Sequence, residues 1–145
     1  MADFVFEDRW YLAAPVPRVA TVVVDLEYYP LWWPQILAVA SLGPDDARVL
    51  CRSTLPYTLD LVLHAVTREP PVLEVELSGD LEGHVAWTLH PVAAGTRMDL
   101  YQRVGVRGVV LSRLSRIGAP LMRWNHARMM RGCLAGLRAR LDAGD

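Results

Sequence analysis

The chain has 145 residues, 52% of them hydrophobic, and a formal net charge of −1. This length suits one domain with a core that needs neither disulfides nor metals, so we expect a single domain over residues 1–145. No run of residues approaches the roughly 18 apolar positions of a transmembrane helix, and the first residues lack the basic and apolar regions of a signal peptide. The sequence therefore predicts a cytoplasmic protein without stable membrane insertion.

The basic residues are all arginine, and charge is unevenly distributed along the chain. Residues 1–99 hold 6 arginines and 14 acidic residues, whereas residues 100–145 hold 9 arginines and 2 aspartates. This pattern is typical of a basic helix against an acidic sheet, with a site for anionic ligands or nucleic acid as the alternative. Because aromatic residues are not interleaved with the arginines as single-strand binding requires, we expect no nucleic-acid partner. Cys51 and Cys133 lack metal-ligand spacing, and we expect both to stay reduced.

The N-terminal part of the chain predicts a strand, a short helix and an aromatic segment. Alternating apolar residues indicate a strand over residues 4–12, with Asp8 as the exception on the apolar face. Pro17 suits the first turn of a helix, which we expect over residues 17–25. Residues 25–34 contain two prolines four positions apart, which exclude a long helix, together with four aromatic residues that form a bulky apolar plug.

From residue 35 onward, apolar residues recur at every second position. This period predicts strands separated by turns rich in glycine, proline and aspartate. The predicted strands span residues 35–42, 47–55, 57–67, 71–78, 81–90 and 96–106. Consecutive strands joined by short turns form an antiparallel meander with one buried face.

The last part of the chain predicts a helix over residues 109–142, which Pro120 bends or restarts. Beyond Pro120, apolar and small residues recur at spacings of three and four and define one face of the helix. Gly132 and Gly136 lie on that face, and we expect them to let the helix approach the sheet closely and close one end of a cavity. The elements together predict one α+β domain.

Four segments of the sequence carry a family resemblance that spans nearly the whole chain. They are Ala14-Pro15-Val16-Pro17 with Asp25…Tyr29-Pro30-Leu31-Trp32-Trp33-Pro34, then Gly79-Asp80-Leu81-Glu82-Gly83…Trp87-Thr88-Leu89, Gly95-Thr96-Arg97, and Trp124-Asn125-His126…Met130-Arg131-Gly132…Gly136-Leu137. In these residues and in its order of elements, the chain resembles the START/Bet v 1-like (SRPBCC) superfamily, and within it the bacterial branch labelled polyketide cyclase/dehydrase.

The resemblance implies an α+β helix-grip fold. In that fold, a curved antiparallel sheet of about six to seven strands wraps around a long C-terminal helix, and two short helices follow the first strand. The apolar face of the sheet and the apolar face of the helix would then line one shared cavity. Members include lipid carriers, hormone receptors and aromatase/cyclases, so the resemblance by itself does not choose an activity.

Polar residues on those two faces are the most informative candidates, because a buried polar group needs a partner. Gln102 is in phase with the apolar positions of the strand over residues 96–106 and should point inward, towards Asn125, the backbone or a ligand. Asn125 lies on the apolar face of the helix and can bond either to the sheet or to a ligand. His126 lies one position further round, as a polar edge residue or as a proton donor in the cavity. Tyr57 would present its hydroxyl inside.

The other candidate ligand contacts are large and apolar, with plain core packing as the alternative for each. Met122 and Met129 carry flexible thioethers that adapt to varied ligands. Trp87 is in phase with the apolar residues of its strand and should point inward. Either Trp32 or Trp33 should face the cavity while its neighbour packs outward, and we take Trp33 as the ligand contact.

The leading functional hypothesis is a protein that binds a hydrophobic small molecule of lipid, polyketide or isoprenoid type. The first alternative is a polyketide aromatase/cyclase or dehydratase, which requires a titratable group in the cavity; no histidine or acidic residue clearly points inward. The second alternative is a protein-interaction module that uses the basic C-terminal helix.

We expect no metal, because no histidine pair has ligand spacing, and no cofactor, because phosphate-binding and dinucleotide-binding motifs are missing from the sequence. We expect a monomer or a homodimer.

Overall fold

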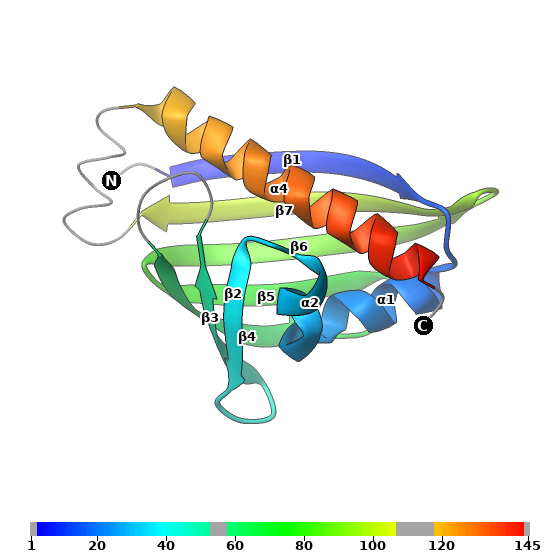
Figure 1. Cartoon of the computed structure of the whole chain (residues 1–145), viewed down its shortest axis with the longest axis horizontal. Helices are drawn as coiled ribbons and strands as arrows, with labels where there is room; N and C mark the ends of the chain where they lie inside the picture. Colours follow the sequence, from blue (N-terminus) through cyan, green and yellow to red (C-terminus); the bar gives the residue numbers. More distant parts are fainter. Residues whose placement is uncertain (1–2, 53–57, 107–117, 144–145) are drawn as a thin grey trace.

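The structure, a computed structural model, describes residues 3–52, 58–106 and 118–143, and in them a curved antiparallel sheet faces a long C-terminal helix (Figure 1). The elements are β1 (Asp3–Leu12), α1 (Val16–Val24), the 3-10 helix η1 (Leu26–Tyr28), α2 (Tyr29–Trp32), β2 (Ile36–Ser41), β3 (Asp46–Cys51), β4 (Leu59–Thr67), β5 (Val72–Gly79), β6 (Leu81–Val92), β7 (Gly95–Val106) and α4 (Ala119–Asp142). The predicted α+β helix-grip fold is confirmed.

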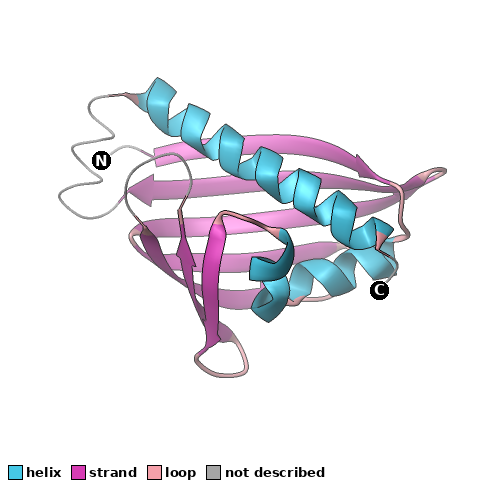
Figure 2. Cartoon of the chain, viewed as in Figure 1, coloured by secondary structure: helices cyan, strands magenta, loops and turns pink. Residues whose placement is uncertain are grey.

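The seven strands form one sheet in the order β1-β7-β6-β5-β4-β3-β2. The strands from β2 to β7 are an antiparallel meander, and β1 adds to the far edge by pairing with β7. The helices lie on one side of the sheet, with α4 crossing it diagonally and α1 and α2 near the C-terminal end of α4 (Figure 2). All the apolar rows of the strands therefore face the same layer of helices.

The inward row of β7 follows the period of two that the sequence predicts. Met98, Leu100 and Val104 are buried, and Gln102 is in phase with them. In the sheet register Gln102 lies directly opposite Phe6 of β1 and Val85 of β6. Residues directly opposite on neighbouring strands share a face of the sheet, so Gln102 is the polar member of an otherwise apolar row across three strands.

The predicted strand bounds agree with the structure to within a few residues where the chain is described. Predicted positions in 53–57 and 107–117 lie outside the described residues. The described part of the C-terminal helix begins at Ala119, and Pro120 occupies its first turn, where a missing backbone N–H leaves no bond unmade. Pro120 thus starts this helix and does not bend it.

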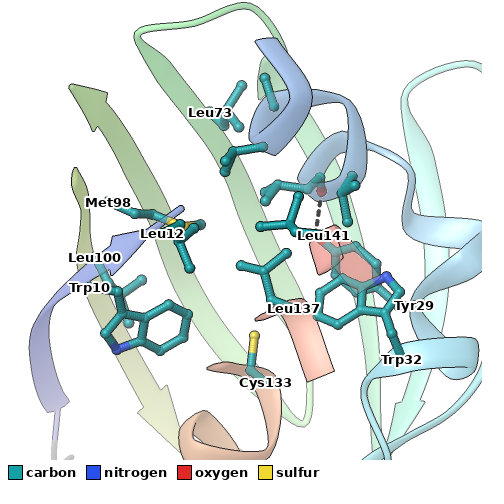
Figure 3. Packing of buried hydrophobic residues seen from close by; sticks show 14 of the residues in the cluster. Trp10, Leu12, Tyr29, Trp32, Leu73, Met98, Leu100, Cys133, Leu137 and Leu141 are labelled. Atoms are coloured by element: carbon teal, nitrogen blue, oxygen red, sulfur yellow. Dashed lines mark hydrogen bonds between the residues drawn. The ribbon is translucent and has the colours of Figure 1, made fainter. Parts of the chain in front are cut away.

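The C-terminal half of α4 packs into a continuous apolar core. Cys133, Leu137 and Leu141 are almost fully buried there, and Figure 3 shows them gathered in one cluster with Trp10 and Tyr29. The hydroxyl of Tyr29 is also buried and donates a hydrogen bond to the carbonyl of Val23 in α1. A satisfied hydroxyl lets this ring fill the core without a desolvation penalty.

The two glycines of α4 allow a close approach, but to a different segment than the sequence suggested. A Cβ atom added at Gly136 would lie 1.6 Å from the carbonyl oxygen of Trp32, and one added at Gly132 would lie 2.1 Å from Oε1 of Gln35. The prediction that these glycines contact the sheet was therefore wrong. The short connection from α2 to β2 passes directly against the helix, so it occupies the space that the missing side chains leave.

Arginine side chains connect α4 to the sheet edge and to α1. Arg123 and Arg138 donate hydrogen bonds to the carbonyls of Val5 and Tyr11 on the edge strand β1. From α1, Arg18 donates a hydrogen bond to the carbonyl of Leu141 at the C-terminal end of α4. A cation at this end also complements the helix dipole.

Candidate ligand cavity

A cavity of about 680 Å³ lies between the sheet and α4. Its walls are mostly aliphatic, because the inward positions of β3 to β7 carry branched side chains. The aliphatic wall includes Val49, Leu59, Leu61, Leu63, Val75, Leu77, Leu81, Val85 and Val104. Cys133 and Leu137 also line the cavity, and both belong to the buried core.

Seven of the eight predicted ligand contacts line this cavity. They are Trp33, Trp87, Gln102, Met122, Asn125, His126 and Met129. The eighth, Tyr57, lies outside the described residues. The four residues from α4 come from its N-terminal half, and the period of 3.6 residues places them on the face that looks towards the sheet.

The apolar wall of the cavity contains a hydrogen-bonded polar pair, His126 from α4 and Gln102 from β7. Nε2 of His126 lies 3.0 Å from Oε1 of Gln102. Because an amide oxygen only accepts, Nε2 carries the proton in this arrangement and Nδ1 is left as an acceptor. The imidazole ring also stacks on Phe6, with 3.6 Å between the ring centroids and 12° between the planes. Phe6 and Gln102 are register partners on β1 and β7. This pair of strands therefore contacts both the face of the imidazole ring, through Phe6, and its edge, through Gln102.

Burial keeps this imidazole neutral. Desolvation lowers the pKa of His126 to about 4, and the positive charge of Arg123 contributes to the same shift. At neutral pH the cavity therefore contains a histidine that can donate one hydrogen bond and accept another, without a net charge.

The sequence left the partner of Gln102 and the position of His126 open. In the structure Oε1 of Gln102 bonds to His126, which was not among the partners expected for it, and His126 lines the cavity instead of lying only at its edge. The reason is geometric: α4 crosses the strands diagonally, so the residue that meets β7 is one position further round the helix than the middle of the apolar face. Periodicity gives the face of a helix but not the point at which it crosses a strand.

Both tryptophans of the aromatic segment line the cavity, whereas we expected one of them to pack outward. The rings of Trp32 and Trp33 stack, with 6.0 Å between their centroids and 19° between their planes. Helix α2 ends at Trp32, and Trp33 is extended, so the two side chains leave the backbone in similar directions. The indole N–H of Trp33 donates to the carbonyl of Met129 at 3.1 Å, which joins the aromatic segment to α4.

The rim of the cavity is rich in carboxylates that sequence reasoning did not identify. The lining includes Asp25, Glu27, Asp45, Asp46 and Glu74. In the sequence these residues belong to turns and to the outer faces of strands. The curvature of the sheet brings the segments that carry them, residues 25–27, 45–46 and 74, to the same cavity.

Ion pairs at the same rim fix the turn between β2 and β3. Arg68 donates to the carboxylate of Asp45 and to the carbonyl of Pro44, and Nδ1 of His64 lies 2.8 Å from a carboxylate oxygen of Asp46. Because these side chains are about half exposed, we expect each pair to contribute little to stability.

The two cysteines are free, buried thiols in the cavity lining. Burial raises the pKa of Cys51 to about 12 and also raises the pKa of Cys133. Both thiols therefore stay protonated and pack as small apolar groups. Within the described residues, no group of three or more potential ligands could hold a metal ion, and none of the described helices is long and apolar enough to span a bilayer.

The sheet, the single long helix and the hollow between them define a helix-grip protein with an interior ligand-sized cavity. A family model described as polyketide cyclase/dehydrase and lipid transport matches residues 4–142. The chain belongs to this family. A comparison with curated proteins finds no match.

Solved structures with the same fold include three of nearly the same length. A START superfamily protein from Mycobacterium smegmatis is 16% identical, with a TM-score of 0.79 and coverage of 96% of this chain and 97% of that one. A protein from Thermus thermophilus is 18% identical, with a TM-score of 0.78 and coverage of 99% and 100%. The Zhui aromatase/cyclase from Streptomyces sp. R1128 is 13% identical, with a TM-score of 0.79 and coverage of 97% and 94%. At these identities the similarity establishes the fold alone.

Proposed function

We propose that the protein binds a hydrophobic small molecule of lipid, polyketide or isoprenoid type in the cavity between the sheet and α4. The observation that carries this proposal is a cavity of about 680 Å³ with aliphatic walls and a partly buried polar pair, Gln102 and His126. Sites for small molecules typically measure roughly 300–1,000 Å³ and combine apolar walls with a few placed polar groups. A filled interior would have favoured the protein-interaction alternative instead.

The walls would supply affinity and the polar groups would supply orientation. A ligand that buries about 300 Å² of apolar surface gains roughly 7 kcal/mol at about 25 cal/mol per Å², before the cost of immobilisation. Met122 and Met129 would adapt to its shape. Gln102, Asn125 and His126 would bond to one oxygen-bearing end of the ligand, since a polar group that stays unpaired in such a site lowers affinity.

Binding can be tested with purified protein and a neutral fluorescent probe such as N-phenyl-1-naphthylamine, followed by displacement with long-chain alcohols and by native mass spectrometry. We expect saturable binding at one probe per chain and displacement by the alcohols. Gln102→Leu should weaken alcohols about tenfold while leaving an alkane unaffected, because it removes one hydrogen-bonding group. Tyr101→Phe, on the exposed face of the same strand, is the matched control. Absence of saturable probe binding would refute the proposal.

A second candidate function is a polyketide aromatase/cyclase or dehydratase, and the observation that favours it is the neutral imidazole of His126 in the cavity wall. Such a group can transfer a proton to or from a substrate held beside it. Among the similar structures, the Zhui protein is described as an aromatase/cyclase.

Turnover of a poly-β-keto thioester mimic, followed by the absorbance of the aromatic product, tests this candidate. We expect His126→Gln to lower turnover at least a hundredfold while probe binding changes little. Equal turnover in the wild type and in protein-free buffer would exclude catalysis and leave the binding proposal intact.

A further inference from the structure

In the part of the chain that the structure describes, the cavity interior offers hydrogen bonds but no compensating positive charge. Among the described residues that line it between the sheet and α4, the amides of Gln102 and Asn125 and the imidazole of His126 are uncharged polar groups, and the hydroxyl of Tyr29 and the indole N–H of Trp33 already donate to backbone carbonyls. A carboxylate or phosphate moved from water to such a place loses its hydration, and without a paired cation this costs several kcal/mol. An alcohol, ketone or ester at the same position loses far less and can still be bonded.

The rim of the cavity also disfavours anionic ligands. Five carboxylates line it, from the segment after α1, from the β2–β3 turn and from β5. The arginine among them, Arg68, already donates to the carboxylate of Asp45. The remaining field is negative, and a negative field at an opening repels anionic molecules and lowers their rate of association.

Of the arginines in residues 3–52, 58–106 and 118–143, Arg52 and Arg123 also lie near the cavity, and neither is placed to anchor an anion inside it. Arg123 lines a separate groove between β1 and α4, and its guanidinium lies 5.8 and 5.7 Å from the ring centroids of Phe4 and Phe6. Arg52 does line the cavity, but it is exposed at the end of β3. A charged group held there would stay in water, so it would gain little from pairing.

We infer that the ligand is uncharged, an inference that rests on the proposed binding function. The cavity binds a neutral alcohol, ketone or ester of polyketide, isoprenoid or lipid type. It discriminates against free fatty acids and other anionic lipids. The carboxylates at the rim and the uncharged polar groups inside act together, the first on approach and the second on burial. Selectivity of this kind is a difference between the affinities for two ligands. Here it comes largely from the weak binding of anionic ligands.

The test compares ligands of one chain length that differ only in the head group. 1-Hexadecanol, methyl palmitate and palmitate are titrated against the N-phenyl-1-naphthylamine complex at about pH 7.5, below their aggregation limits. We expect the alcohol and the ester to displace the probe at concentrations at least tenfold lower than palmitate. Palmitate that competes as well as the alcohol overturns the inference. Failure of the probe itself to bind overturns the proposed function instead, so the two failures are distinguishable.

Variants at the rim separate its contribution from that of the interior. Asp25→Asn with Glu27→Gln should strengthen palmitate about threefold and leave hexadecanol unchanged, because both side chains are exposed and neither packs in the core. Asp142→Asn, which removes an exposed carboxylate at the far end of α4, is the control and should change neither ligand. Unchanged palmitate affinity in the double variant contradicts the role of the rim.

Arg52→Gln addresses the opposite explanation. We expect the order of the three ligands to stay the same in this variant. If palmitate matches the alcohol in the parent protein and loses its affinity selectively in Arg52→Gln, then Arg52 anchors an anionic head group and the inference is wrong.

Discussion

The two halves of α4 belong to one continuous helix but face different surroundings. In the packed half, residues 130–142, the side chains of Cys133, Leu137 and Leu141 are 3%, 0% and 9% exposed. In the open half, residues 119–129, the inward side chains are only partly buried and face the cavity. The same apolar period therefore produces a solid core in one place and a hollow in the other.

The difference comes from what lies beneath each half. The packed half meets α1 and the segment from α2 to β2, which fill the layer between helix and sheet (Figure 1). The open half reaches the sheet through side chains alone, among them the bond from His126 to Gln102. We therefore expect the packed half of α4 to contribute more to the stability of the domain than the open half, whose inward side chains border the cavity. Local stability commonly varies across a domain in this way.

The largest expected effect is at the centre of the packed half. Leu137→Ala should lower the free energy of unfolding by about 4 kcal/mol, because it removes a fully buried side chain and leaves a void in a close-packed region. Met122→Ala, in the open half, should cost about 1 kcal/mol, since its side chain already borders empty space. Denaturation by urea measures both. Equal losses at the two sites would contradict the division of the helix.

A backbone contact is the next test of the packed half. Gly136→Ala should lower the free energy of unfolding by about 2–3 kcal/mol, because its Cβ would lie 1.6 Å from the carbonyl oxygen of Trp32 and the backbone would have to move. Gly43→Ala, with nothing within 4 Å of its Cβ, is the matched control. A neutral Gly136→Ala variant would show that α4 does not rest on the α2–β2 segment.

The pH dependence of stability tests the burial of His126 in the open half. Its folded pKa is about 4, below the unfolded value of about 6.5, so the unfolded chain binds the proton first as the pH falls. Stability should be complete above about pH 7 and about 2 kcal/mol lower at about pH 5. His126→Gln should remove this loss, which urea denaturation at both pH values measures.

His64 provides a control of opposite sign. The carboxylate of Asp46 raises the pKa of His64, so its contribution is present at acid pH and disappears as the pH rises through the folded pKa. His64→Gln should therefore lower stability at acid pH alone. If His126→Gln leaves the acid loss of the wild type unchanged, the imidazole of His126 is not buried as described.

The smallest effect on stability is expected from filling the hollow. Val85→Phe should change the free energy of unfolding by less than about 1 kcal/mol, since its ring can enter existing space, and it should weaken probe binding at least tenfold. Val19→Phe, at a fully buried position of α1, should cost about 3 kcal/mol. A large loss of stability in Val85→Phe would indicate that the open half is packed after all.

Much of the fold follows from patterns inside single segments. The period of two located the strands and placed Gln102 inward, and Pro30 with Pro34 limited α2 to one turn. The family resemblance placed the cavity between the sheet and the last helix. These features are local, because alternation along a strand and the spacing of three and four along a helix are properties of the backbone itself.

The sequence alone thus determined the elements, their inward faces and seven residues of the cavity wall. Only the tertiary structure decided that His126 bonds to Gln102, that Trp32 and Trp33 both face the hollow, and that carboxylates from three segments meet at its rim. These relations depend on the angle at which α4 crosses the strands and on the curvature of the sheet. Neither quantity is encoded by the period of one segment, because each arises from how the elements pack against one another.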